Sequence, residues 1–78
     1  ITFDVDCFDP SVMPATGTPE PGGLSWFQAV AILDSVAKGR EICGADVVEL
    51  APAAGMHAAD FTAAKLVYTI IGMLSNKR

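Results

Sequence analysis

Residues 3–25 read FDVDCFDPSVMPATGTPEPGGLS, and this stretch decides which fold the chain can adopt. It opens with apolar residues that alternate with Asp4 and Asp6, a pattern typical of a short β-strand whose polar residues gather at its carboxyl end. We predict this strand over residues 1–6, stopped by Pro10, which offers no backbone donor. Side chains two residues apart lie on one face of a strand, so Asp4 and Asp6 are expected to point the same way.

The two aspartates of this strand need a partner, because burying an unpaired charge costs roughly several kcal/mol. Open α/β sheets bind their ligands at the carboxyl ends of parallel strands. One divalent cation there, or two cations about 3.5–4 Å apart bridged by a carboxylate, would neutralise Asp4 and Asp6. The residues alone leave two alternatives open. The aspartates are solvated strand-end residues, or the D-x-D-x-x-D spacing is a calcium loop, although it lacks the Gly and further acid of an EF-hand.

The segment after the strand has the composition of a stiff, shaped loop. Residues 10–23 hold four of the five prolines and three of the seven glycines, which is incompatible with a regular helix or strand. A loop this long inside a compact domain is usually functional or disordered, and the prolines favour a defined shape. Asp9 is expected to cap the turn before Pro10.

Residues 24–39 carry the signals of a helix. Ser25 and Gln28 form the S-x-x-Q pattern of a capping box, and Leu24 precedes them as a hydrophobic staple. Gly39 is placed to cap the end of the helix. The apolar residues between these signals follow a helical spacing: Phe27, Val30, Ile32, Leu33, Val36 and Ala37.

A second strand and a second helix follow. Residues 42–50 read as a strand buried on both faces, as in a parallel sheet. The loop after it carries the only histidine, His57, for which a surface or structural role is expected and a substrate-loop role is the alternative. A helix is predicted from residue 61 to residue 74, capped by Asp60 or Thr62. Two such βα units pair in parallel, and the sheet should continue in residues outside this chain or in partner chains.

Composition limits the classes of protein to which this chain can belong. The 78 residues are one domain at most, with nine acidic against five basic residues, which argues against binding to nucleic acid or anionic membranes. No apolar run reaches the roughly 18 residues of a membrane span. Cys7 and Cys43 are expected to be reduced thiols, as in a cytoplasmic protein. Because the first residue already reads as strand interior, we interpret the chain as a portion of a longer protein.

The opening stretch resembles the signature of the ureohydrolases, the arginase and agmatinase family. The resemblance continues through GADVVELAPAAG at 44–55 and TAAKLVY at 62–68, so it covers nearly the whole chain and is nearest to agmatinase-like members. It implies an α/β fold, a three-layer sandwich around a mainly parallel sheet. Residues 1–78 would supply the C-terminal portion of that domain, its last two βα units.

The resemblance also implies a site. By position, Asp4 would bridge two Mn²⁺ ions and Asp6 would bind one of them, while Glu49 would help hold the guanidinium group of the substrate and Thr18 would line the same pocket. The other metal ligands of the family and its proton-shuttling histidine lie in motifs that these residues do not contain. His57 is not expected to replace that histidine.

The activity implied is hydrolysis of an agmatine-like guanidino compound to urea and an amine, as in polyamine metabolism, by a cytoplasmic homo-oligomer, a trimer or hexamer. Two metal ions would activate a bridging water for attack on the guanidinium carbon. The 78 residues alone are expected to be inactive. The alternative is a truncated, non-catalytic remnant that acts only in subunit association.

Overall fold

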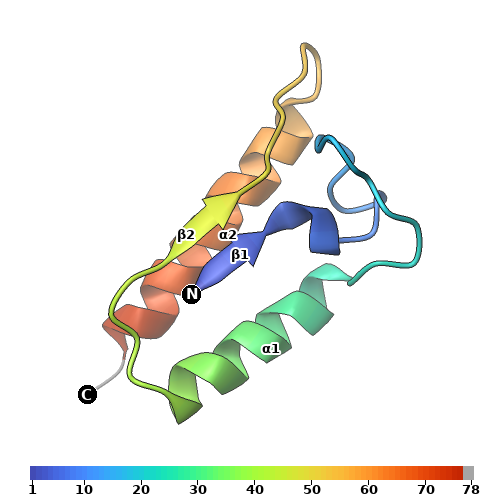
Figure 1. The fold of residues 1–78 in the computed structure, drawn as a ribbon. Helices are drawn as coiled ribbons and strands as arrows, with labels where there is room; N and C mark the ends of the chain where they lie inside the picture. Colours follow the sequence, from blue (N-terminus) through green and yellow to red (C-terminus); the bar gives the residue numbers. More distant parts are fainter. Residues whose placement is uncertain (77–78) are drawn as a thin grey trace.

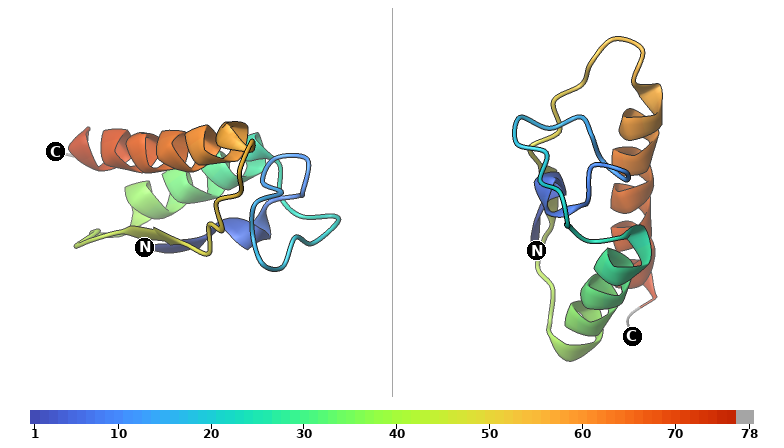
Figure 2. Two further views of the ribbon diagram at one scale, coloured as in Figure 1. Left: turned by 90° about the horizontal axis from the view of Figure 1, so that it is seen from above. Right: turned by 90° about the vertical axis from the view of Figure 1, so that its right-hand side faces the viewer.

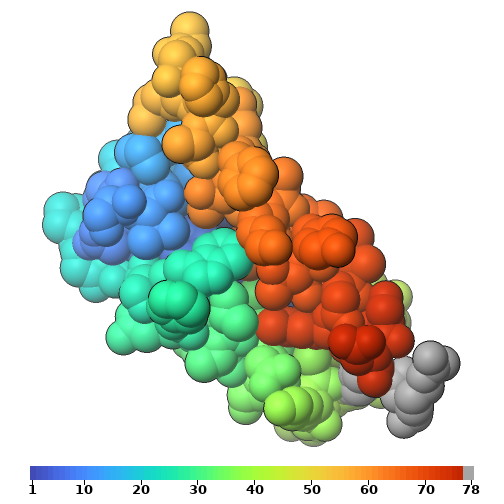
Figure 3. Space-filling model, turned by 180° about the vertical axis from the view of Figure 1, so that it is seen from behind, coloured from blue at the N-terminus to red at the C-terminus, as the bar shows by residue number. Residues whose placement is uncertain are grey.

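The computed structural model describes residues 1–76 and shows two short strands packed against two helices. In chain order the elements are β1 (Thr2–Asp4), the 3₁₀-helix η1 (Val5–Cys7), α1 (Trp26–Gly39), β2 (Asp46–Val48) and α2 (His57–Ser75). Both helices lie on the same side of the strands (Figures 1 and 2). Viewed from behind, α1 and α2 lie next to each other and form most of that surface (Figure 3).

The two strands are parallel, as the βαβα order predicts. The register pairs Thr2 with Asp46 and Asp4 with Val48, so both strands end at the same edge of the sheet. Each strand is shorter than predicted. β1 ends at Asp4 instead of residue 6 because the chain turns into η1, and β2 ends at Val48 because Glu49 takes a positive φ of 72°, which is not extended backbone.

Helix α1 begins as the sequence predicts. Ser25 Oγ accepts from the Gln28 amide at 3.1 Å and Gln28 Oε1 accepts from the Ser25 amide at 2.9 Å, a complete capping box. The prediction for its end is wrong, since Gly39 is the last helical residue and Arg40 is the cap. The buried face of α1 is also narrower than predicted. Its buried residues lie four positions apart and are Ala29, Leu33 and Ala37. Phe27, which is 81% exposed, and Ile32 face outward instead.

Helix α2 begins four residues before its predicted start. Its N-cap is Met56, with no side-chain cap hydrogen bond, so neither Asp60 nor Thr62 caps it. Thr62 Oγ instead donates to the Ala58 carbonyl at 2.9 Å, inside the helix. The good helix formers after His57 and an acidic residue in the first turn, which suits the helix dipole, explain the earlier start.

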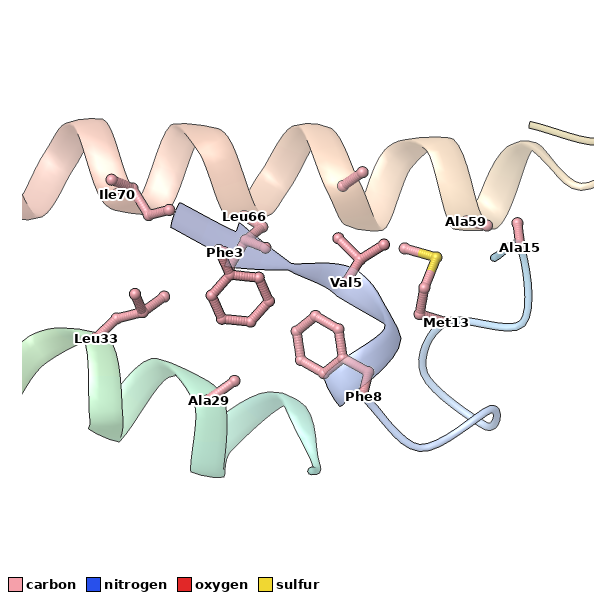
Figure 4. Packing of buried hydrophobic residues seen from close by; sticks show 11 residues of the cluster. Phe3, Val5, Phe8, Met13, Ala15, Ala29, Leu33, Ala59, Leu66 and Ile70 are labelled. Carbon is pink, nitrogen blue, oxygen red and sulfur yellow. The ribbon is translucent and has the colours of Figure 1, made fainter. Parts of the chain in front are cut away.

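The core lies between the helices and the first strand and includes part of the long loop. Met13 and Ala15 are buried there, with Met13 beside Val5 under α2 (Figure 4). Phe8 contacts the Phe3 ring at a centroid distance of 5.4 Å and stacks on Trp26 at 6.1 Å. The whole buried cluster is Phe3, Val5, Phe8, Met13, Ala15, Ala29, Leu33, Ala59, Ala63, Leu66 and Ile70. The loop is therefore anchored by apolar packing and has a defined shape.

Two further sequence expectations concern the surface. Cys7 is half-buried and Cys43 is exposed, and both are free thiols. None of the helices within residues 1–76 is both long enough and apolar enough to cross a lipid bilayer.

Candidate metal and substrate site

The candidate site is built around Asp4, the last residue of β1. Its Oδ1 accepts a hydrogen bond from the Asp6 amide at 3.0 Å, so Asp4 caps the 3₁₀-helix that follows. The prediction that Asp4 and Asp6 share one face of a strand is wrong, because Val5–Cys7 is not extended. The turn nevertheless keeps the two acidic residues together at the carboxyl edge of the sheet.

Asp6 is held from the long loop. Thr18 Oγ1 donates to Asp6 Oδ2 at 2.9 Å, a contact between residues twelve positions apart. Each aspartate thus has one oxygen engaged by a donor. The second oxygens, Asp4 Oδ2 and Asp6 Oδ1, receive no hydrogen bond from residues 1–76, and neither carboxylate forms an ion pair with them. Two half-buried carboxylates with unused oxygens are a donor set suited to a hard divalent cation such as Mn²⁺.

The charges of Asp4 and Asp6 affect the thiol of Cys7 in η1. The pKa of the Cys7 thiol is raised, first by burial and then by the negative charges of Asp4 and Asp6. Both causes disfavour a third negative charge beside the two carboxylates. The carboxylates of Asp4 and Asp6 therefore lie close enough to the Cys7 thiol to act on it.

The two ends of the long loop are tied together next to this edge. Asp9 accepts from the Ser11 hydroxyl at 2.6 Å, from the Ser11 amide at 2.9 Å and from the Gly22 amide at 3.0 Å, which confirms it as the cap of the turn. These bonds, those to Ser11 foremost, lower the pKa of Asp9. A carboxylate that accepts several hydrogen bonds is stabilised in its charged form, so Asp9 is a structural anion of the loop.

Backbone contact closes the loop beside Asp9. The Leu24 amide donates to the Cys7 carbonyl at 2.8 Å, and the Asp9 amide donates to the Leu24 carbonyl at 2.9 Å. A Cβ on Gly23 would lie 2.6 Å from three backbone atoms: Asp9 N, Cys7 O and Phe8 C. Only glycine allows the two segments to approach this closely, and the approach fixes where the loop returns to α1.

Glu49 lies at the same edge as Asp4. It is the residue after Val48, which pairs with Asp4 across the sheet, and its side chain is exposed. Its φ of 72° is the only positive φ of a non-glycine residue within residues 1–76. A left-handed conformation costs roughly 1–2 kcal/mol for such a residue, and strain of this kind is concentrated at functional sites. Two residues later the Ala51 amide donates to the Ala15 carbonyl at 2.8 Å, which connects this edge to the loop.

His57 does not lie in the loop after β2, as predicted, but is the exposed first residue of α2. The structure thus brings Asp4, Asp6 and Thr18 together and puts Glu49 at the same edge of the sheet, while His57 begins α2 outside this group. Residues 1–76 contain no group of three or more His, Cys, Asp or Glu side chains arranged to hold a metal ion.

Sequence reasoning missed two contacts. It assigned Thr18 to the substrate pocket and not to the carboxylate of Asp6, and it did not foresee the bond between Ala15 and Ala51. A hydrogen bond between residues twelve positions apart depends on the path of an irregular loop, for which the sequence carries no periodic signal.

Comparison with known sequences identifies the family. The sequence model of the arginase family matches residues 1–72, so the chain belongs to the arginase family. It is 51% identical over 73 residues to the N(1)-aminopropylagmatine ureohydrolase of Thermus thermophilus, a match that covers 94% of this chain and 25% of that protein. It is 38% identical over 73 residues to the agmatinase of Pyrococcus horikoshii, covering 94% of this chain and 26% of that protein. The chain thus spans about a quarter of these relatives.

Comparison with solved structures confirms the predicted fold class. The agmatine ureohydrolase of Thermoplasma volcanium superposes with a TM-score of 0.84 at 32% identity, over 96% of this chain and 25% of that one. The arginase of Medicago truncatula superposes with a TM-score of 0.83 at 35% identity, over 94% and 23%. The parallel strand pair and its two helices are a part of the α/β arginase fold.

Proposed function

We propose that residues 1–78 form part of a ureohydrolase that cleaves an agmatine-like guanidino compound to urea and an amine. The observation that carries the proposal is the pair of half-buried carboxylates, Asp4 and Asp6, which each keep one oxygen free of donors at the carboxyl edge of the sheet. Membership of the arginase family supports the reaction class. The similarity to an agmatinase and to N(1)-aminopropylagmatine ureohydrolases supports a linear guanidino substrate.

Manganese is the cofactor in this proposal. Asp4 would help to hold two Mn²⁺ ions and Asp6 would help to hold one of them, because carboxylate oxygens are hard donors and both carboxylates keep lone pairs that no described residue uses. When bound, such a pair of ions lowers the pKa of a water molecule and supplies hydroxide near neutral pH. The remaining ligands would come from parts of the complete protein outside this chain.

The chain would also bind and orient the substrate. Glu49 presents an exposed carboxylate at the same edge as Asp4, where it can pair with a guanidinium through charge-assisted hydrogen bonds. The strained backbone of Glu49 supports this role, since a glycine would meet the same conformation at lower cost. Thr18 offers hydroxyl lone pairs to a guanidinium N–H beside Asp6.

Residues 1–78 would form one portion of a single cytoplasmic ureohydrolase domain that assembles as a homo-oligomer. Large apolar side chains exposed on both helices, Phe27 and Phe61 among them, support cover by other parts of the domain or by further subunits. The isolated chain would lack most metal ligands and would therefore be inactive.

Urea release tests the proposal. The complete protein that contains these residues is loaded with Mn²⁺ and assayed with agmatine, N(1)-aminopropylagmatine and arginine, beside purified residues 1–78 from a host without ureohydrolase. We expect urea from at least one linear guanidino compound with the complete protein and none from residues 1–78. No urea from any of the three substrates, or urea from residues 1–78 alone, would overturn the proposal.

A further inference from the structure

We propose that Thr18 is a positioning residue that orients the Asp6 carboxylate for metal binding. The inference rests on the proposed function and deepens it, because family resemblance assigns Thr18 to the substrate pocket alone. The structure instead gives the Thr18 hydroxyl a direct partner, Asp6 Oδ2, at 2.9 Å. No other side-chain hydrogen bond within residues 1–76 reaches the Asp6 carboxylate.

A threonine hydroxyl can donate to only one partner at a time. A threonine has one O–H donor and two acceptor lone pairs, and here the donor is used on Asp6 Oδ2. Asp6 Oδ2 therefore accepts one hydrogen bond and keeps a further lone pair, while Oδ1 accepts no hydrogen bond from the described residues. A carboxylate without such a donor rotates more freely, so the hydroxyl restricts the orientation of the Asp6 carboxylate.

The position of Thr18 is set by contacts of its own loop. The Thr18 amide donates to Thr16 Oγ1 at 3.2 Å, which closes a tight turn just before it. Ala15 is buried in the core, and its carbonyl accepts from the Ala51 amide at 2.8 Å. The hydroxyl is thus delivered to Asp6 by a segment that is anchored both in the core and to the strand exit at Glu49.

This anchoring has a consequence for the site as a whole. The segment 15–18 contacts Asp6 at one end and the chain two residues beyond Glu49 at the other. It therefore connects the proposed metal ligand to the strand exit that carries the proposed guanidinium ligand. A hydroxyl whose proton is already donated presents only acceptors to a third group, which suits an N–H of a guanidinium and rejects an acceptor.

The test compares three variants of the complete protein, measured by Mn²⁺ affinity and by steady-state kinetics. Thr18→Val removes the hydroxyl with little change of shape, Thr18→Ser keeps it, and Thr69→Val is the matched control, because Thr69 Oγ1 donates to the Lys65 carbonyl within α2. Groups that orient metal ligands typically contribute about 10–100-fold to metal affinity or activity. We expect Thr18→Val to weaken one of two Mn²⁺ sites by about tenfold or more and to change the Mn²⁺ electron paramagnetic resonance spectrum.

The same set separates the inference from the proposed function. Thr18→Ser and Thr69→Val should bind Mn²⁺ within about threefold of the parent protein, because both retain the Asp6 contact. One contrary result is a parent protein that binds two Mn²⁺ ions and releases urea, beside a Thr18→Val variant that keeps the parent's Mn²⁺ affinity and shows only a raised KM. That result would overturn the positioning role and make Thr18 a substrate contact only. Failure of Thr18→Ser to restore affinity would overturn it as well. A parent protein that neither binds Mn²⁺ nor releases urea would overturn the proposed function itself.

Discussion

Replacing Glu49 with Gln and with Gly separates its charge from its backbone conformation. Its side chain is exposed and forms no hydrogen bond within residues 1–76, so its removal leaves no described partner unpaired. Glu49→Gln keeps the shape and the φ of 72° but loses the charge. Glu49→Gly loses the charge and relieves the left-handed conformation, which only glycine adopts without cost.

The expected magnitudes differ for function and for stability. Losing one hydrogen-bonded contact to a cation costs about 1.5–3 kcal/mol, roughly a tenfold to hundredfold drop in kcat/KM for both variants. For stability, Glu49→Gln should be neutral within about 0.5 kcal/mol, as for most exposed substitutions. Glu49→Gly should recover about 1–2 kcal/mol of conformational cost and lose about 0.5–1 kcal/mol to chain entropy, so it should be as stable as the parent or slightly more stable.

Kinetics, Mn²⁺ content and denaturant midpoints of the complete protein would be measured on the same preparations. The account predicts two variants with full Mn²⁺, intact stability and lowered kcat/KM. Unchanged kinetics in Glu49→Gln would remove Glu49 from the substrate site. Loss of Mn²⁺ would reassign it to the metals, and a clear destabilisation by Glu49→Gly would refute the argument that the backbone there is strained.

Two further predictions concern the loop. Gly23→Ala should destabilise the protein by about 1–3 kcal/mol, because the added Cβ would lie 2.6 Å from Asp9 N, Cys7 O and Phe8 C and would break the two backbone hydrogen bonds there. Gly17→Ala is the control, because a Cβ on Gly17 would have nothing within 4 Å. Equal denaturation midpoints for the two variants would contradict the prediction. The lowered pKa of Asp9 means that its contribution to stability is complete above the ordinary aspartate pKa and is lost as pH falls through the lowered value. Asp9→Asn should therefore reduce the dependence of stability on pH in the acid range, and an unaltered acid profile would show that the carboxylate does not hold the turn.

The sequence predicts those parts of the fold that rest on local chemistry. The capping box of Ser25 and Gln28 and the turn at Asp9 depend on side chains within a few residues, and both form as predicted. The parallel pairing follows from the βαβα order. The prediction that the second strand is buried on both faces is wrong, because Asp46 is exposed and Val47 and Val48 are only half-buried. Apolar periodicity predicts the start of α2 too late, because the periodic pattern begins at residue 61. The helix itself begins at His57, with small residues that carry no periodic signal.

The sequence predicts that Asp4 and Asp6 lie at the carboxyl edge of the sheet, and the structure has them there. An alternating pattern cannot reveal that Val5–Cys7 turns into a 3₁₀-helix capped by Asp4. The contact between Thr18 and Asp6 depends on how residues 10–23 fold over the sheet edge. That path is set by tertiary packing of Met13 and Ala15, which no local rule encodes.

The most direct test of the central claim is the Mn²⁺ stoichiometry of Asp4→Asn and Asp6→Asn in the complete protein, measured by elemental analysis after dialysis. An amide has one good acceptor oxygen and cannot bridge two cations as a carboxylate does. The account predicts two ions per chain in the parent, loss of both from Asp4→Asn, and loss of chiefly one from Asp6→Asn. Urea release should be feeble in Asp6→Asn, because hydroxide activation uses both ions. If Asp4→Asn retains two tightly bound ions, the carboxyl edge of β1 is not the metal site.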